Sequence, residues 1–491
     1  MSNLSELLPT GGGQNAVDFV ASGTLSSGQT VALKADGTVS VVSATGTSIP
    51  ESIPAGSEYV YNAAQTNFPQ IAFDPNDAGK FVIAYRDAGN SNFGTAIVGT
   101  VNGATLSFGA EYVFSGYTNS PSLVFDPNNA GKFVIAYRDN DNSSYGTAIV
   151  GTVSGTTISF GSEVVFNSGV TNTISCAYDS LNSKVVIAYT NSSNSGYGTV
   201  VIGTISGSAI SFGSPVVFES ATTDGKSCVF DSTNNKVVIA YDDSGNTSKG
   251  TAIVGTVSGT SISFGSPVVF GTNYTSKISM AFDSTTGKVV VAYADYSNSE
   301  RLTAIVGTVS GTSISFGSIV SNGNICGNTA IAFDPASSGK CVISYKNNSN
   351  TSYGTAVTGT VTGTSFAFGS ENVFNAGTTD YTAMAFDPNS AGKFLVTYQD
   401  GSNSSYGTAV VGQTAATLTN NTDFIGITAE AISDTATGAV NVYGGINEAQ
   451  SGLTIGSDYY VQADGSLSTT ASSVKVGKAI SATTINMMDL T

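Results

Sequence analysis

Apolar and polar positions along the chain recur with a spacing of 51 to 53 residues. Each copy contains two marker residues that separate its first two apolar runs, and seven copies can be aligned on them. The Asp that closes the first apolar run recurs at Asp74, Asp126, Asp179, Asp231, Asp283, Asp334 and Asp387. The Lys that opens the second run recurs at Lys80, Lys132, Lys184, Lys236, Lys288, Lys340 and Lys393. Internal repetition on this scale indicates an array of similar supersecondary units.

Each copy is predicted to form four β-strands. The second run, such as KVVIAY at 236–241, is almost continuously apolar, which is typical of a strand covered on both faces. Turn residues separate the runs, including the hairpin signal Ser154-Gly155 between the third and fourth strands. Four strands per copy and seven copies predict an all-β fold, a seven-bladed β-propeller. The repeated Asp and Lys residues are interpreted as turn caps and exposed ion pairs of small energetic value.

The two ends of the repeat array complement each other. The last copy stops after its third strand, at 407–415, and a segment resembling the missing fourth strand lies at 46–61, ahead of the first copy. We therefore expect an N-terminal strand to complete the last blade and close the ring, which leaves no open sheet edge.

The flanking segments resemble each other. Residues 28–40 parallel 456–468, and both contain an Asp-Gly hairpin turn, at Asp36-Gly37 and Asp464-Gly465. We predict that residues 1–45 and 419–491 form one small β domain, and that the propeller at 46–418 is inserted in it. The alternative is two independent β modules at opposite ends of the propeller.

Composition and charge exclude several classes of function. The chain has no His and no Trp, and only 17 basic residues against 34 acidic ones, for a net charge of −17. Without His, the Ser-His-Asp and Cys-His arrangements and His-ligated zinc are excluded. An acidic chain is a poor partner for nucleic acid. No signal peptide is recognisable in MSNLSELLPTGGGQNAV, and no apolar run is long enough to span a membrane.

The loops between the second and third strands, and the segments between blades such as 115–120, 219–227 and 321–328, differ among copies. Loops on a rigid scaffold are a usual place for recognition. The residue that follows each of these strand-two-to-three loops is aromatic or cationic, and the seven positions are predicted to form a glycan-binding rim. These residues are Phe93, Tyr145, Tyr197, Lys249, Arg301, Tyr353 and Tyr406. The competing interpretation is that the side chains only cover hairpin ends and blade edges.

Two other chemistries were weighed against glycan binding. Asp139, Asp141 and Ser143 alternate like the start of a calcium loop, but Asx turns explain them equally well. A sialidase-like glycosidase would need an arginine triad, for which only Arg86, Arg138 and Arg301 are available in the chain. No residue pair stands out as an acid and a nucleophile. We therefore expect no enzymatic activity, no metal and no cofactor.

The four cysteines do not indicate a disulfide framework. Cys176 and Cys228 occupy a first-strand position that is aliphatic in the other copies, and Cys341 replaces Phe or Val at the start of the second strand. Only Cys326, expected in a loop, is placed to pair, and the chain offers it no evident partner.

The repeat GTAIVGTVSGTSISFGSPVVF, with FDPNDAGKFVIAYRD before its counterpart, resembles repeat proteins of marine and cyanobacterial tailed bacteriophages. The stretch YYVQADGSLSTTASSVKVGKAISATTIN resembles the C-termini of phage virion proteins. The resemblance implies a structural protein on the virion surface, made in the host cytoplasm, as a capsid decoration protein, head fibre or tail fibre. It also implies other virion proteins, further copies of the chain and host surface glycans as partners. It carries over no catalytic residues. The alternatives are a carbohydrate-processing propeller enzyme and a cellular lectin.

Overall fold

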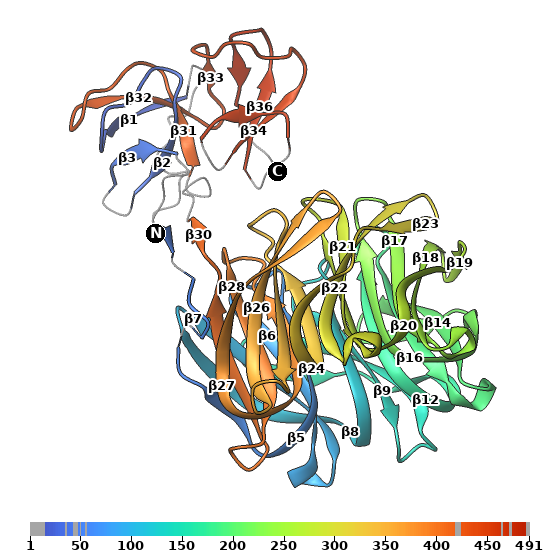
Figure 1. The fold of residues 1–491 in the computed structure, drawn as a ribbon. Helices are drawn as coiled ribbons and strands as arrows, with labels where there is room; N and C mark the ends of the chain where they lie inside the picture. Colours follow the sequence, from blue (N-terminus) through green and yellow to red (C-terminus); the bar gives the residue numbers. More distant parts are fainter. Residues whose placement is uncertain are drawn as a thin grey trace. The chain divides into compact units, whose positions relative to one another are not determined.

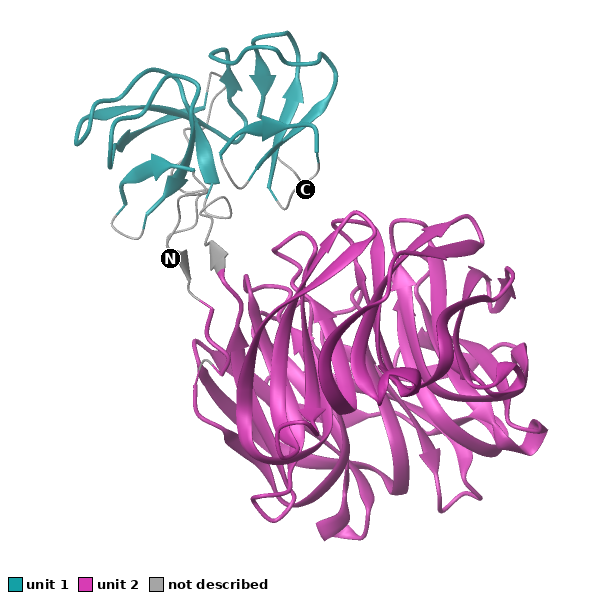
Figure 2. Cartoon of the chain, in the orientation of Figure 1, with its two compact units in different colours: residues 1–49, 417–491 teal, residues 50–416 magenta. Residues whose placement is uncertain are grey.

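The computed structural model describes residues 15–34, 37–42, 48–49, 51–54, 56–417, 424–462, 465–470 and 474–487. The chain divides into two compact units: residues 1–49 with 417–491, and residues 50–416 (Figure 2). The prediction of an all-β fold is confirmed, because the described residues form strands and a few 3-10 turns. Within these residues, no helix is long and apolar enough to cross a membrane.

The larger unit contains strands β5 to β29, which are hydrogen-bonded to one another in a closed cycle (Figure 1). The second strands of the seven copies are β6 (Lys80–Asp87), β9 (Lys132–Asp139), β13 (Lys184–Asn191), β17 (Lys236–Asp243), β21 (Lys288–Asp295), β25 (Lys340–Asn347) and β28 (Lys393–Asp400). The third strands are β7 (Phe93–Asn102), β10 (Tyr145–Ser154), β14 (Tyr197–Ser206), β18 (Lys249–Ser258), β22 (Arg301–Ser310), β26 (Tyr353–Thr362) and β29 (Tyr406–Gln413). Their Val, Ile and aromatic residues suit strands buried on both faces.

The remaining long strands connect one copy to the next. They are β5 (Tyr59–Phe73), β8 (Thr105–Phe125), β12 (Val164–Asp179), β16 (Val216–Asp231), β20 (Val268–Asp283), β24 (Val320–Phe333) and β27 (Ser365–Phe386). The first part of each strand after β5 pairs with a third strand and its last part pairs with the following second strand, as β8 does with β7 and β9. The segments 115–120, 219–227 and 321–328, expected as loops between blades, therefore lie inside strands β8, β16 and β24.

A shift in register inside each long strand explains this difference from the prediction. In β8 the pairing to β9 skips from Asn119 to Ser122, and Ser120 between them has a φ of 46°. Equivalent residues in five other copies also have positive φ: Phe68, Thr173, Gly225, Lys277 and Tyr381. An extra residue of this kind bends and twists a strand, so the chain changes partner without leaving extended structure.

Short elements complete the copies. Four fourth strands are separate: β11 (Thr157–Phe160), β15 (Ala209–Phe212), β19 (Ser261–Phe264) and β23 (Ser313–Phe316). Single 3-10 turns occupy four of the loops between second and third strands: η2 (Ala88–Asn90), η3 (Ser192–Asn194), η4 (Ser244–Asn246) and η5 (Tyr296–Asn298). Strand β5 pairs with β29, with Tyr59 opposite Ala409 and Asn62 opposite Gly407. This pairing joins the two ends of the repeat array.

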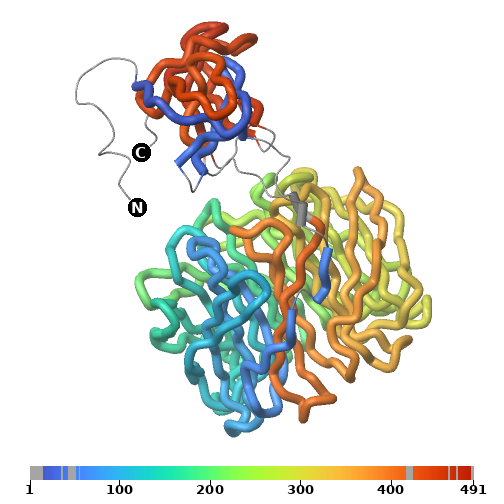
Figure 3. Tube along the Cα trace, turned by 90° about the vertical axis from the view of Figure 1, so that its left-hand side faces the viewer, coloured from blue at the N-terminus to red at the C-terminus, as the bar shows by residue number. Residues whose placement is uncertain are grey.

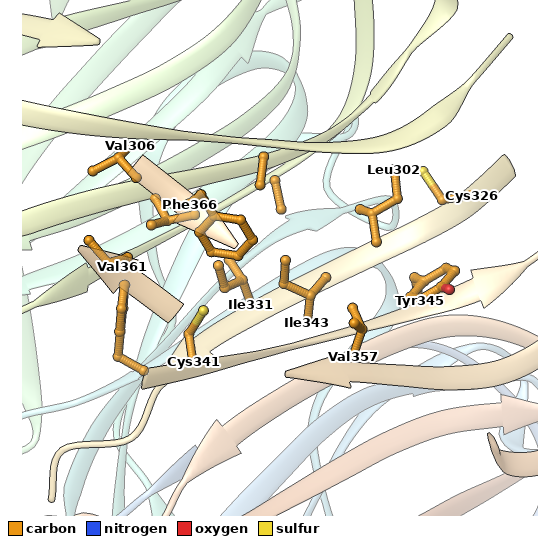
Figure 4. Packing of buried hydrophobic residues seen from close by; sticks show 14 of the residues in the cluster. Leu302, Val306, Cys326, Ile331, Cys341, Ile343, Tyr345, Val357, Val361 and Phe366 are labelled. Carbon is orange, nitrogen blue, oxygen red and sulfur yellow. The ribbon is translucent and has the colours of Figure 1, made fainter. Parts of the chain in front are cut away.

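The core is built from interlocking glycines and aromatic rings. A Cβ atom on Gly151 would lie 2.1 Å from the Phe133 ring, so only glycine fits at this third-strand position. In the sixth copy Cys341 takes the place of Phe133, and the Phe366 ring instead lies against the equivalent glycine (Figure 4). All four cysteines are free, and Cys326 lies buried in β24 rather than in the expected loop.

The repeated Asp residues do not form the exposed ion pairs expected from the sequence. They are buried, with exposures of 2% or less, and they accept hydrogen bonds from backbone N–H groups of their own turn. Some also accept from the next copy, as Asp74 does from Gly131 N at 2.9 Å. The lysines bond elsewhere: Lys288 Nζ donates to Thr308 Oγ1 at 2.9 Å. The turn-cap part of the interpretation therefore describes these Asp residues, and the ion-pair part is wrong.

The smaller unit contains two five-stranded sheets with the same strand order. The first comprises β1 (Ala16–Val20), β32 (Thr437–Val442), β31 (Phe424–Thr428), β2 (Thr30–Leu33) and β3 (Val39–Val41). The second comprises β33 (Ile446–Asn447), β37 (Ile485–Asn486), β36 (Lys475–Ala479), β34 (Asp458–Val461) and β35 (Leu467–Ser468). The first sheet thus combines strands from both ends of the chain, and Figure 3 shows blue and red segments interleaved there.

The matching order makes the second sheet a copy of the first. Hairpin β2–β3 corresponds to β34–β35, and the next strand inward is β31 in one sheet and β36 in the other. The turn residues Asp36 and Asp464 lie outside the described residues. In the second sheet residues 469–474 connect the hairpin to the next strand, whereas in the first this connection runs from 42 to 423 and contains the whole larger unit. Strands β4 (Ser48–Ile49) and β30 (Ala416–Thr417) pair with each other at the two ends of that insertion.

Candidate functional site

The seven predicted rim residues occupy equivalent places at one end of the larger unit's strands. Each begins a third strand and pairs with the last residue of the preceding second strand, as Phe93 does with Asp87 and Tyr145 with Asp139. Arg301 is exposed, and the other six are half-buried. No ring contact within the described part of the chain joins two of the seven. The structure therefore places one rim residue in each copy and does not gather them into a single patch.

Each rim residue lies beside a second residue that the sequence comparison did not single out. These cross-strand partners lie in the long connecting strands. In chain order of the rim residues, the partners are Tyr117, Val170, Thr222, Tyr274, Ile325, Thr378 and Gln65. Tyr117 and Tyr274 are about two-fifths exposed, and the Tyr274 ring packs on Tyr296 with ring centroids 4.3 Å apart. Each rim position is thus a pair of side chains whose second member varies from copy to copy.

The loop of the following copy holds several of these partners in place. Asp141 Oδ2 accepts a hydrogen bond from Tyr117 N at 2.8 Å, and Ser193 Oγ accepts one from Val170 N at 2.8 Å. Asp139 Oδ1 accepts from the N–H groups of Asp141 and Asn142. The Asp139 and Asp141 carboxylates, considered for calcium, are thus used to fix backbone. The described residues contain no group of three or more carboxylate or thiol side chains arranged to hold a metal ion.

A second set of side chains links successive copies at the same end of the strands. In five of the seven copies, the next-to-last residue of the second strand forms a hydrogen bond with the long strand of the following copy. We call each of these hydrogen bonds a link. They run from Arg86 to Asn119, Arg138 to Asn172, Thr190 to Thr223 O, Lys346 to Asp380, and Gln399 to Asn67. We call this set the inner ring. Arg86 and Arg138, the two arginines at equivalent positions, bind amide side chains here.

Two links of the inner ring are missing. Asp242 makes none to the fifth copy, and Ala294, whose side chain has no polar atom, makes none to the sixth; we call the first of these gaps the break. A cavity of about 410 Å³ is lined by residues of the first five copies, and Asp242 and Ser276 at the break contribute to it together with Phe68 and Lys226. The aromatic wall is composite, because the Phe68 ring packs between the Tyr381 ring at 4.6 Å and the Arg86 guanidinium at 4.9 Å.

Lys226 is the most unusual residue of this region. In the other copies the equivalent position is uncharged: Pro69, Pro121, Ile174, Ile278, Thr329 and Thr382. Lys226 is buried all the same, with 8% of its surface exposed. Its Nζ donates to the hydroxyls of Thr173 and Thr190 and to Thr223 O. Sequence comparison of the copies could have found it as a charged residue at an otherwise uncharged position.

Burial favours the uncharged forms of Lys226 and Asp242 and shifts both pKa values accordingly. Burial lowers the pKa of Lys226 to about 7, although the charges of Asp224 and Asp242 oppose this shift. Burial raises the pKa of Asp242 to about 6, partly offset by a hydrogen bond from Ser248. Between pH 7 and 10.5 the folded chain has lost the Lys226 proton while the unfolded chain retains it, so stability rises with pH in that window.

We predict that Lys226→Met flattens this part of the stability profile. Wild-type protein should gain stability between pH 7 and pH 9 relative to the variant, measured as the difference in Tm by thermal unfolding at pH 6, 7, 8 and 9. Lys277→Met, which removes an exposed lysine from the same cavity, should keep the wild-type profile. Parallel profiles for wild type and Lys226→Met would contradict the buried titration.

Comparison with known proteins gives a likeness in structure only. No protein-family model matches the chain, and no curated protein matches its sequence. The chain is similar to the crystal structure of the BP39L lectin from Burkholderia pseudomallei, with a TM-score of 0.53 and 9% identity over 73% of this chain and 99% of the lectin. It also matches a protein of unknown function from Dyadobacter fermentans, with a TM-score of 0.46 and 14% identity over 75% of this chain and 99% of that one. At 9% identity the likeness to the lectin concerns the fold alone.

Proposed function

We propose that residues 50–416 form a seven-bladed β-propeller that binds glycans with the rim, and that the smaller unit attaches it to the surface of a phage particle. The closed cycle of strands and the seven equivalent pairs of second and third strands support the propeller. In this arrangement each long strand ends one blade and begins the next, and β5 completes the blade of β28 and β29.

The observation that carries the glycan-binding proposal is the placement of the rim residues. Five aromatic and two cationic side chains lie one per copy at the same end of the strands, each beside a variable partner. Aromatic faces pack on the C–H surfaces of sugar rings, and the neighbouring Asn, Ser and Asp side chains offer donors and acceptors for hydroxyls. The likeness of fold to a lectin is consistent with this use of the surface.

The proposed location rests on the sequence resemblance to phage virion proteins and on the organisation of the smaller unit. A tail fibre usually separates an N-terminal anchor from a distal tip, whereas strands from both ends of this chain share one sheet. This favours a capsid decoration protein or head fibre over a tail fibre. The role is structural and adhesive, without catalysis, and the partners are other virion proteins, further copies of the chain and host surface glycans. Immunogold labelling of purified particles with an antibody against the chain would locate it on head or tail.

A glycan array tests the rim. A variant with Tyr145, Tyr197, Tyr353 and Tyr406 changed to Ala should lose about 100-fold or more of apparent affinity for the glycans that wild type binds, because avidity of 10² to 10⁴ depends on several sites acting together. A matched control changes four exposed valines of the long strands, Val113, Val165, Val217 and Val269, to Ala and should bind as wild type. Unaltered binding by the tyrosine variant would refute the rim.

A further inference from the structure

The break in the inner ring leaves buried hydrogen-bonding groups without partners. Asp242 takes the place that Arg86 has in the first copy, and Ser276 takes the place of Asn119. Asp242 Oδ1 and Ser276 Oγ are both buried, and neither has a hydrogen-bond partner. Asp242 is only 4% exposed. Each unmet buried group of this kind costs about 1–3 kcal/mol. Asp242 and Ser276 line the same cavity, so a group bound there could complete the hydrogen bonding of both.

Lys226 does not donate to either of these two groups. An ammonium has three protons to donate, and those of Lys226 have oxygen partners on Thr173, Thr190 and Thr223. The carboxylate of Asp242 can only accept. A bound group that satisfies both atoms must therefore donate a hydrogen bond to Asp242 Oδ1 and form a second hydrogen bond with the Ser276 hydroxyl.

The cavity at the break selects among ligands that carry such donors. Its volume of about 410 Å³ lies within the range of about 300–1,000 Å³ that small-molecule pockets occupy. Asp224 and Lys277 also line it, so with Asp242 and Lys226 its wall carries two acidic and two basic side chains. A free metal cation meets the basic side chains there and a free anion meets the acidic ones, which disfavours both. The Phe68 ring adds an apolar platform.

We propose that this sector binds one neutral sugar residue, whose adjacent hydroxyls donate to Asp242 Oδ1 and share a hydrogen bond with Ser276 Oγ while its ring packs against Phe68. The site is single in the chain because its charged residues occur in one sector of the ring. It rests on the proposed carbohydrate binding for the class of ligand, but it uses none of the seven rim side chains, although Tyr274, the partner of Lys249, also lines the cavity.

Titration calorimetry of the full chain with D-glucose, D-galactose, D-mannose and L-rhamnose tests the proposal. We expect saturable binding of at least one of them at one site per chain, weakened tenfold or more by Ser276→Ala and by Asp242→Asn. Ser276→Ala removes a hydroxyl that lacks a partner, so it should not lower stability, and its Tm reports whether the fold is intact. Asp380→Asn, at the position equivalent to Ser276 in a completed link, is the matched control and should bind as wild type.

The outcomes separate this site from the rim. The variant lacking four rim tyrosines should bind the free monosaccharide with wild-type affinity, and Ser276→Ala should retain multivalent binding on the glycan array. Absence of saturable binding of all four sugars to wild type would overturn the proposal. So would binding unaffected by Ser276→Ala and Asp242→Asn, and so would saturable binding of CaCl₂ that Asp242→Asn abolishes.

Discussion

Tyr61→Ala is expected to lower the free energy of unfolding by about 3–5 kcal/mol, the cost of truncating a large aromatic residue in a core. Tyr61 lies in β5, the strand that joins the two ends of the repeat array, and is 6% exposed. Its ring packs edge-on against Tyr85 at 5.3 Å, and its hydroxyl accepts a hydrogen bond from Thr397 Oγ1 at 3.0 Å. The substitution therefore removes contacts to the first copy and to the last one together.

Urea denaturation followed by circular dichroism measures this loss. Val60→Ala, in the same strand but 43% exposed, should change stability by no more than about 0.5 kcal/mol. Hydrogen exchange should show faster opening of β29, the partner of β5, in Tyr61→Ala. A variant as stable as wild type would show that the end-to-end pairing contributes little to the fold.

Asp283→Ala should cost about 3–5 kcal/mol, because each buried donor left without its acceptor costs about 1–3 kcal/mol. Asp283 is 2% exposed, and its carboxylate accepts hydrogen bonds from Thr285 N, Thr285 Oγ1 and Thr286 Oγ1. It also accepts from Gly339 N in the next copy at 2.9 Å. Alanine leaves all four donors without this acceptor, two of them on the backbone, so the turn and the contact between copies weaken together.

The same denaturation experiment includes two comparisons. Asp283→Asn retains one carbonyl oxygen as an acceptor and should lose less stability than the alanine variant. Asp77→Ala, at an exposed Asp in the equivalent turn of the first copy, should be close to neutral. Equal effects of Asp283→Ala and Asp77→Ala would refute the role of the buried carboxylate.

The repeat pattern predicted the strands better than it predicted their connections. Runs such as KVVIAY identify buried strands because nearly every side chain is apolar, and β17 and β21 follow directly. The segment 115–120 was expected to be a loop because it is rich in Gly, Ser and Asn. Instead it stays in the strand, because one extra residue at Ser120, with positive φ, shifts the register and lets the strand change partner. The side chains of this segment do not indicate that backbone conformation.

The sequence likewise predicted one part of the candidate site and not the other. The positions of Tyr145 and Tyr197 at the starts of third strands follow from aligning the copies. Their partners Val170 and Thr222 do not, because the register shifts inside β12 and β16 decide which residue lies opposite. The burial of Lys226 depends on Thr173 and Thr190, which belong to the preceding copy and come near it only when the third and fourth copies pack together. Pairwise patterns along the chain do not contain that contact.

The smaller unit folds around an inserted domain, and this has a consequence for how the insert can be replaced. Its hairpin β2–β3 and strand β31 pair as β34–β35 and β36 do, although 42–423 separates the first set and only 469–474 the second. The sheet therefore forms with either a short or a long connection. The chain leaves the smaller unit at β4 and returns at β30, and these two strands pair with each other. Any domain whose two ends lie side by side satisfies the same geometric requirement. Exchange of the insert therefore needs no compensating change in the smaller unit, so the proposed adhesive surface and the proposed anchor are free to evolve separately.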